Sequence, residues 1–215
     1  MRNLNFVAIE GVIGVGKTTL SRLLSERLAA RLVLEVVEEN PFLPDFYRDM
    51  RRYAFQTQLF FLLSRHRQQK DIQQPDLFLP KTVSDYIFQK DRIFATLNLS
   101  DNELKLYEQI FPILEEQVPV PDLVVYLQAS HDVLMERIAR RGRDFERAMP
   151  PEYIAALGEA YNYFFFHYTT TPLLIVNTNQ VDFINDAGAV EDLIARCEQH
   201  QGGTVYYTPL SPLSE

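Results

Sequence analysis

The sequence predicts an α/β fold in which helices cover both faces of a five-stranded parallel sheet. Short apolar runs alternate with longer segments of helical spacing along all 215 residues, as expected for repeated strand–helix units. The runs at 6–9, 123–127 and 173–176 are apolar at every position, which indicates strands buried on both faces. No repeat or linker interrupts the pattern, so we expect one domain over residues 1–215.

Prolines and caps delimit the expected elements. Pro41 ends the second strand, while Pro80 and Pro121 precede the third and fourth. Ser100 followed three residues later by Glu103 is a capping-box pattern at a helix start. The expected strands are 6–9, 32–38, 81–85, 123–127 and 173–176; the expected helical segments are 20–28, 42–50 (short turns), 54–70, 86–97, 101–117, 133–141, 152–168 and 189–199, and 202–215 is expected to be a loosely attached tail.

The composition narrows the class of function. The net charge of −8 argues against a general nucleic-acid-binding protein. The apolar runs are too short to span a bilayer, and the first residues leave no room for a signal peptide. The single cysteine, Cys197, excludes an internal disulfide. We therefore expect a cytoplasmic protein without membrane contact.

A phosphate-binding loop joins the first strand to the first helix. Its pattern is Gly11, four residues, then Gly16-Lys17-Thr18. Glycines, including Gly14, allow successive N–H groups to point at phosphate oxygens, and the helix N-terminus favours an anion. Lys17 can reach the outer phosphates, and the Thr18 hydroxyl can hold Mg²⁺. The predicted ATP-binding residues of this loop are Gly11, Gly14, Val15, Gly16, Lys17, Thr18 and Thr19.

Carboxylates follow the second and third expected strands. Glu38 and Glu39 end the second, and Asp85 ends the third. Ligands of open α/β sheets bind at the carboxyl ends of the strands, so one glutamate can accept a proton from an attacking hydroxyl and Asp85 can hold Mg²⁺ with Thr18. The alternative is that these acids cap helices or face solvent, which must hold for one of two neighbouring strand residues.

Four arginines form the densest basic cluster: Arg137, Arg140, Arg141 and Arg143. Arg137 and Arg141 are four residues apart and share a helix face, and Gly142 allows the chain to leave the helix. Such a cluster can form a lid that offsets charge on transferring phosphates. The alternative is a solvated basic face.

The long central helix carries two polar residues on one face, Gln58 and Arg65, seven positions apart. Phe61 and Leu62 lie between them. Polar groups framed by aromatic rings suit a flat heterocycle, whereas the alternative is a core helix with two polar ends.

These segments, in this order and spacing, resemble the deoxyribonucleoside kinase family, most closely its bacterial deoxyadenosine/deoxyguanosine kinase branch. The resemblance runs from Phe6 to about Asp186. The matching segments are 9–19 (Ile-Glu-Gly-Val-Ile-Gly-Val-Gly-Lys-Thr-Thr), 38–41 (Glu-Glu-Asn-Pro), 55–65 (Phe-Gln-Thr-Gln-Leu-Phe-Phe-Leu-Leu-Ser-Arg), 84–86 (Ser-Asp-Tyr), 91–95 (Asp-Arg-Ile-Phe-Ala) and 137–143 (Arg-Ile-Ala-Arg-Arg-Gly-Arg).

The resemblance implies a P-loop kinase fold, ATP with Mg²⁺, a homodimer, and phosphorylation of a deoxyribonucleoside, with a purine favoured. It implies that Glu38 is the base for the 5′-hydroxyl and that Asp85 is the first acid of an Asp/Glu-Arg-Ser motif, in which Tyr86 replaces the arginine. The resemblance further implies that the nucleobase is bound by Gln58, Arg65 and Asp91, and the 3′-hydroxyl by Tyr47 and Glu146. It implies a lid at about 137–147 that carries Arg137, Arg141 and Arg143. The adenine of ATP is implied to lie beside Asp182 and Phe183.

Two other functions remain open from the sequence. A nucleoside monophosphate kinase, such as one for thymidylate, needs a cationic site for its acceptor's phosphate, and the acids at 38 and 39 argue against one. A non-catalytic scaffold of the same fold would not need Lys17, Thr18 and the lid. Asp91 can pair with adenine, guanine or cytosine, so the base stays open.

Overall fold

A computed structural model describes residues 4–74, 78–181 and 183–209. Its centre is one parallel sheet with the strand order β2-β3-β1-β4-β5-β6. The sheet confirms the expected fold class, but it has six strands rather than the expected five. The strands are β1 (Phe6–Gly11), β2 (Arg31–Val33), β3 (Thr82–Ser84), β4 (Leu123–Gln128), β5 (Leu173–Asn177) and β6 (Thr204–Tyr207).

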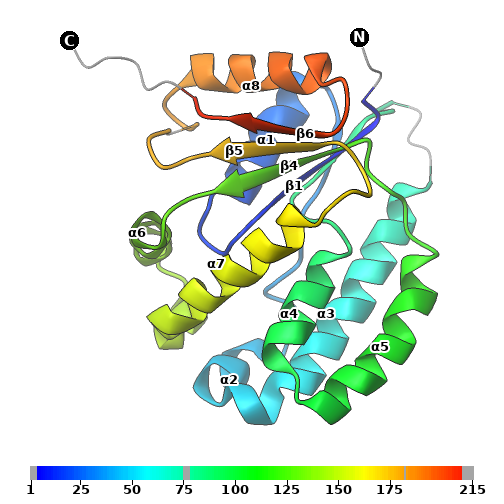
Figure 1. Ribbon diagram of the computed structural model, residues 1–215, viewed down its shortest axis with the longest axis vertical. Coiled ribbons are helices and arrows are strands. Elements are labelled where there is room, and N and C mark those ends of the chain that lie inside the picture. The colour runs from blue at the N-terminus through cyan, green and yellow to red at the C-terminus, as the bar shows by residue number, and fades with distance from the viewer. Residues whose placement is uncertain (1–3, 75–77, 182, 210–215) are drawn as a thin grey trace.

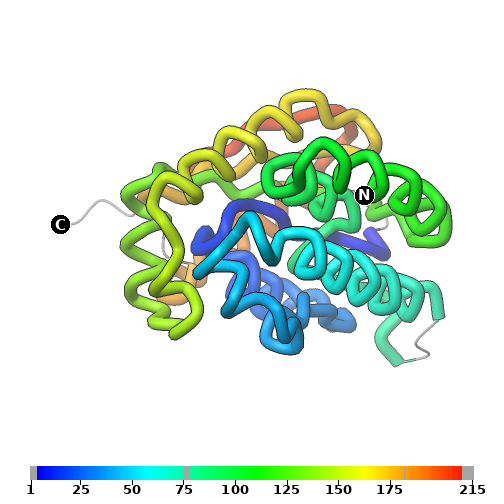
Figure 2. The backbone as a smooth tube through the Cα atoms, turned by 90° about the horizontal axis from the view of Figure 1, so that it is seen from below, coloured from blue at the N-terminus to red at the C-terminus, as the bar shows by residue number. Residues whose placement is uncertain are grey.

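Helices lie on both faces of the sheet (Figure 1). Helices α1 and α8 pack together on one face. Helix α7 covers the other, where its Phe165 ring stacks on Tyr126 of β4, and α4 packs against α7. The long α3 runs beside α4 and α5 (Figure 2). The helices are α1 (Lys17–Arg27), α2 (Leu43–Arg48), α3 (Met50–Ile72), α4 (Lys90–Asn98), α5 (Asp101–Glu115), α6 (His131–Arg141), α7 (Pro151–Phe166) and α8 (Ala187–Gln199), with a 3₁₀ turn, η1, at Asp144–Ala148.

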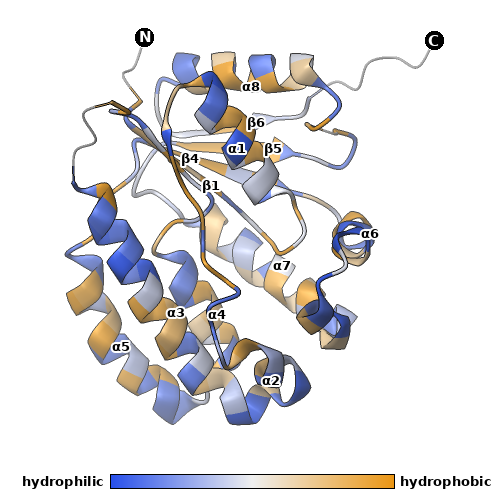
Figure 3. Ribbon diagram, turned by 180° about the vertical axis from the view of Figure 1, so that it is seen from behind, coloured by the Kyte–Doolittle hydropathy of each residue, from blue (hydrophilic) through white to orange (hydrophobic). Residues whose placement is uncertain are grey.

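The core follows the apolar runs of the sequence. Every residue of β1 is buried, as are the first five of β4. The surrounding helices show both apolar and polar faces (Figure 3). Ser100 and Glu103 form the expected capping box at the start of α5, in which the Ser100 backbone N–H donates to Glu103 Oε2 at 2.9 Å.

The tail expected at 202–215 contains the sixth strand. Residues 204–207 extend the sheet in parallel register beside β5, with Leu173 opposite Thr204 and Val176 opposite Tyr207. The Tyr207 ring is buried and its hydroxyl donates to Asp192 of α8. The expectation of a loose tail was therefore wrong for these residues, because a four-residue strand of this composition gains its stability from pairing with β5.

The second strand is shorter than expected. It ends at Val33, whereas the apolar pattern predicted a strand to residue 38. At that point the backbone N–H of Asp85 bonds Val33 O, and the Asp85 carboxylate accepts the N–H of Glu35. The Asp85 side chain thus bonds a backbone N–H that a longer strand would pair with the backbone of β3. The chain therefore leaves the sheet edge after Val33, and residues 34–40 form an irregular segment.

The described residues include no helix that is both long and apolar enough to cross a lipid bilayer.

The pair Tyr206 and Tyr207 tests whether β6 contributes to stability. Tyr207 is 7% exposed and Tyr206 is 72% exposed. We expect Tyr207→Ala to lower the free energy of unfolding by about 3 kcal/mol, and Tyr206→Ala to change it by less than about 0.5 kcal/mol. Urea denaturation of the two variants measures both; equal small effects would show that the segment is dispensable.

Candidate active site

The phosphate-binding loop has the backbone that its glycines require. Gly11, Gly14 and Gly16 have φ angles of 148°, 89° and 107°, a region that disfavours a β-carbon. Helix α1 starts at Lys17, and no side chain caps its first turn. Its N-terminal N–H groups are therefore available to an anion.

Two of these glycines also permit close approach. A β-carbon on Gly11 would lie 2.5 Å from Leu127 O of β4, and one on Gly14 would lie 2.7 Å from Ile138 Cγ1 of α6. The loop is thus packed between the sheet and the arginine-bearing helix, which fixes its position relative to both.

Lys17, Thr18 and Asp85 lie together at this loop. The Lys17 ammonium donates to Gly11 O at 2.7 Å and Val12 O at 3.1 Å. The Thr18 hydroxyl donates to Asp85 Oδ2 at 2.6 Å, so the structure brings together the two residues expected to hold Mg²⁺. A hydroxyl and a carboxylate are oxygen ligands suited to this ion, which ordinarily completes its shell with phosphates and water.

A cavity of about 280 Å³ extends from the phosphate loop to α3. Lys17, Thr18 and Asp85 line one end, and Gln58, Arg65 and Phe94 line the other. Phe61 also lines it, and the Arg65 guanidinium lies 4.8 Å from the centre of its ring. The cavity therefore joins a phosphate site to a pocket framed by aromatic rings.

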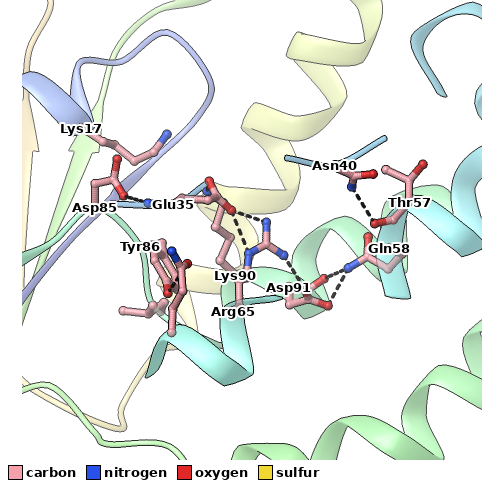
Figure 4. Close-up of polar contacts among 12 residues, drawn as sticks. Lys17, Glu35, Asn40, Thr57, Gln58, Arg65, Asp85, Tyr86, Lys90 and Asp91 are labelled. Atoms are coloured by element: carbon pink, nitrogen blue, oxygen red, sulfur yellow. Dashed lines mark hydrogen bonds and ion pairs between the residues drawn. The ribbon is translucent and has the colours of Figure 1, made fainter. Parts of the chain in front are cut away.

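A chain of buried charges forms the floor of this pocket (Figure 4). Arg65 donates to Glu35 Oε1 through Nε at 2.8 Å and Nη2 at 2.5 Å, and Nη1 donates to Asp91 Oδ2. Lys90 Nζ donates to Glu35 Oε2 at 2.6 Å. Gln58 Nε2 donates to Asp91 Oδ1 at 2.6 Å, and the Tyr107 hydroxyl donates to the same oxygen at 2.8 Å. Two of the expected base-binding residues, Gln58 and Arg65, thus both bond the third, Asp91, which is buried and does not itself line the cavity.

The environment shifts the pKa values of these groups. Burial raises the pKa of the Glu35 carboxyl, but the charges and hydrogen bonds of Lys90 and Arg65 outweigh it, so the pKa lies well below its usual range. Burial raises the pKa of Asp91, and the charge of Arg65 opposes this shift. Burial, together with the nearby Lys90 ammonium, lowers the pKa of Lys17 to about 8. Glu35 is therefore an ionised carboxylate at neutral pH.

The acids expected at the end of the second strand lie at the rim rather than the floor. The Glu38 side chain is 58% exposed and pairs with Arg143 at 2.8 Å. Glu39 is exposed and lies outside the cavity lining. The Glu35 side chain is only 10% exposed. Because β2 ends at Val33, Glu35 is the acid next to the carboxyl end of the strand.

The lid arginines have different partners. Arg137 donates to the backbone oxygens of Val15, Thr178 and Val181, so it ties the phosphate loop to the segment after β5. Arg141 and Arg143 line the cavity, unlike Arg137. Arg141 Nη2 bonds Glu146 at 2.5 Å.

The two residues expected at the sugar both border the same cavity. Tyr47 and Glu146 both line the cavity, and the Tyr47 ring stacks on Phe145 with centroids 6.3 Å apart. Of the residues expected at the ATP adenine, Asp182 lies outside the described residues, and Phe183 packs against the core rather than lining the cavity.

The sequence reasoning missed two buried residues, Glu35 and Lys90. The signal for Glu35 was its position as the one charged residue in the apolar run 32–37, because an acid in such a run needs a buried cationic partner. Lys90 carried no such signal. The sequence predicted a helix over 86–97 with residue 90 inside it, whereas α4 begins at this residue.

A family model described as "Deoxynucleoside kinase" matches residues 7–201. This chain belongs to the deoxynucleoside kinase family. It is 39% identical over 160 residues to the deoxyguanosine kinase of Bacillus subtilis (strain 168), covering 73% of this chain and 76% of that protein. It is 28% identical over 197 residues to the deoxyadenosine/deoxycytidine kinase of the same organism, covering 88% of this chain and 90% of the relative.

Solved structures of deoxynucleoside kinases share the fold. The structure of deoxyadenosine kinase from M. mycoides with bound dATP has a TM-score of 0.76 and 26% sequence identity, with 90% of this chain and 99% of that chain covered. The same enzyme with bound dCTP gives a TM-score of 0.73. The resemblance expected from the sequence, and the kinase class with it, is confirmed.

Gly14 tests the packing of the phosphate loop on α6. We expect Gly14→Ala to raise the KM for ATP on the order of tenfold, equivalent to about 1.4 kcal/mol, because the added carbon displaces the loop from Ile138. The KM for the deoxynucleoside should change little. Gly158→Ala is the matched control, since nothing lies within 4 Å of its added carbon; steady-state kinetics that fail to distinguish the two variants would contradict the prediction.

Proposed function

We propose that this chain transfers the γ-phosphoryl group of ATP to the 5′-hydroxyl of a purine deoxyribonucleoside. The observation that carries the proposal is a single cavity with a phosphate loop at one end and Gln58 and Arg65 at the other, both of them hydrogen-bonded to the buried Asp91. Glu35 lies between the two ends, where an acceptor hydroxyl would meet the phosphates.

In this proposal Glu35, rather than Glu38, orients the 5′-hydroxyl and accepts its proton. Glu35 is held on the cavity floor by two cations, whereas Glu38 is at the rim. Cationic neighbours make Glu35 a weak base, which suits a loose phosphoryl-transfer transition state in which placement contributes more than basicity. Lys17, Arg141 and Arg143 offset charge on the phosphates.

Thr18 and Asp85 would hold Mg²⁺ beside the phosphate loop. The ion would offset negative charge on the β- and γ-phosphates. Among the described residues no cluster of three or more His, Cys, Asp or Glu side chains forms a metal site. With two protein ligands, an octahedral Mg²⁺ would take its remaining ligands from nucleotide phosphates and water.

The acceptor end supports a nucleoside rather than a nucleoside monophosphate. Two cations there, Arg65 and Lys90, are already bonded to Glu35 and Asp91. The phosphate of a nucleoside monophosphate acceptor would therefore find these cations paired and would lie near their carboxylate partners. Tyr47 and Glu146 are proposed to hold the 3′-hydroxyl, with the aromatic wall leaving no partner for a 2′-hydroxyl.

The remaining expectations are part of the proposal. Residues 1–215 form one catalytic domain with a lid at about 137–147, located in the cytoplasm. A homodimer is supported by the exposed Tyr163 and Phe166 on α7.

The two glutamates can be separated by isosteric amides. We expect Glu35→Gln to lower kcat at least about 100-fold, as for a lost catalytic group, with the KM for deoxynucleoside within about threefold. Glu38→Gln, the control at the rim, should keep kcat within about threefold. A coupled assay of ADP release measures both; the reverse order of effects would return the role to Glu38.

Substrate choice can be measured with the four deoxynucleosides and their monophosphates. We expect the largest kcat/KM with deoxyadenosine or deoxyguanosine, and no turnover of the monophosphates, because Arg65 and Lys90 at the acceptor end are already paired with carboxylates. Preference for deoxycytidine would remove the purine assignment, and turnover of a monophosphate would favour the rival kinase class. Absence of turnover with every nucleoside would favour a scaffold.

A further inference from the structure

Lys90 is a buried cation in an unfavourable place. Its side chain is 4% exposed and it is the first residue of α4. Burial disfavours an ammonium ion, and the positive end of a helix dipole disfavours it further. The hydrogen bond that offsets these costs is the 2.6 Å bond to Glu35 Oε2, and the buried Glu10 carboxyl adds a Coulombic attraction without a hydrogen bond.

Lys90 changes the charge balance of the cluster that is hydrogen-bonded to Glu35, although the nearby Glu10 and Lys17 also interact with Lys90. Arg65 is shared between two carboxylates, because it bonds Glu35 on one side and Asp91 on the other. One guanidinium and two carboxylates leave a net negative charge in a buried cluster. Lys90 supplies the second positive charge, which makes the four-residue cluster neutral.

The geometry gives Lys90 a second effect. Arg65, on α3, contacts only Oε1 of Glu35, and Lys90, on α4, contacts Oε2 (Figure 4). The terminal torsion of a glutamate is broad, so a cation on one oxygen leaves the carboxylate plane free to turn. Two cations on different oxygens define that plane. The backbone N–H of Glu35 bonds Asp85, which ties the same residue to the phosphate end of the cavity.

We propose that Lys90 is a positioning residue that holds the Glu35 carboxylate in the orientation from which it receives the acceptor hydroxyl. This inference rests on the proposed function, since it requires Glu35 to be the acid that meets the hydroxyl. Lys90 acts through Glu35 and needs no contact with the substrate.

The test is a double-mutant cycle between Lys90→Met and Glu35→Gln, read by kcat and KM separately. We expect Lys90→Met to lower kcat on the order of 100-fold, the effect of misplacing a reacting group by about 1 Å, with the KM for deoxynucleoside within about threefold. In the Glu35→Gln background the same change should lower kcat no further, because the residue through which it acts is already disabled. Lys105→Met, an exposed lysine on α5, is the control and should match the wild type.

Lys90→Arg keeps the charge and provides a measurement if the Met variant does not fold. We expect a folded Lys90→Arg protein, verified by thermal unfolding, to retain at least about a tenth of wild-type kcat. A Lys90→Met kcat near the wild-type value would overturn the inference, as would an equal loss in both backgrounds, or a folded Arg variant as impaired as Glu35→Gln.

The same series separates the two proposals. If the wild type phosphorylates deoxynucleosides and Glu35→Gln is impaired while Lys90→Met is not, only the role of Lys90 fails. If the wild type is inactive, or Glu35→Gln is unimpaired, the proposed function or its acid fails and the inference falls with it.

Discussion

The buried ion chain from Lys90 through Glu35 and Arg65 to Asp91 is the constraint on which the acceptor half of this protein depends. An unpaired buried ion costs several kcal/mol, so the segment after β2, helix α3 and helix α4 must meet in one arrangement. Tyr107 brings α5 into the same cluster through its bond to Asp91. The cavity floor is consequently rigid and polar, while its walls are aromatic.

Asp85 connects this floor to the phosphate end. One of its oxygens accepts the Thr18 hydroxyl and the other accepts the N–H of Glu35. The Asp85 side chain, at the end of β3, therefore fixes the position of Glu35 relative to the phosphate loop. In the proposed function, the phosphate donor binds at the carboxyl end of the sheet and the acceptor binds among the helices, so the transfer would take place where the two meet.

The mouth of the cavity is built differently from its floor. Arg143 pairs with the exposed Glu38, and Arg141 pairs with Glu146. Ion pairs with solvent-exposed members contribute little stability and are screened by salt. Arg143 can therefore exchange the Glu38 carboxylate for a phosphate at small cost. Arg141 would leave a buried partner, because the Glu146 side chain is only 5% exposed. Arg137, bonded to three backbone oxygens, is suited to hold the phosphate loop in place.

Local features of this protein could be read from its sequence. The phosphate loop lies within a few consecutive residues, its conformation is set by glycine, and the spacing of Gln58 and Arg65 follows from helix geometry. Glu35, Lys90 and β6 depended instead on contacts between distant segments: Asp85 ends β2 at Val33 and selects Glu35, Arg65 gives that acid its partner, and β5 makes a strand of residues 204–207. Tertiary structure decided these features because a buried charge and an edge strand are stable only beside partners that sequence spacing does not reveal.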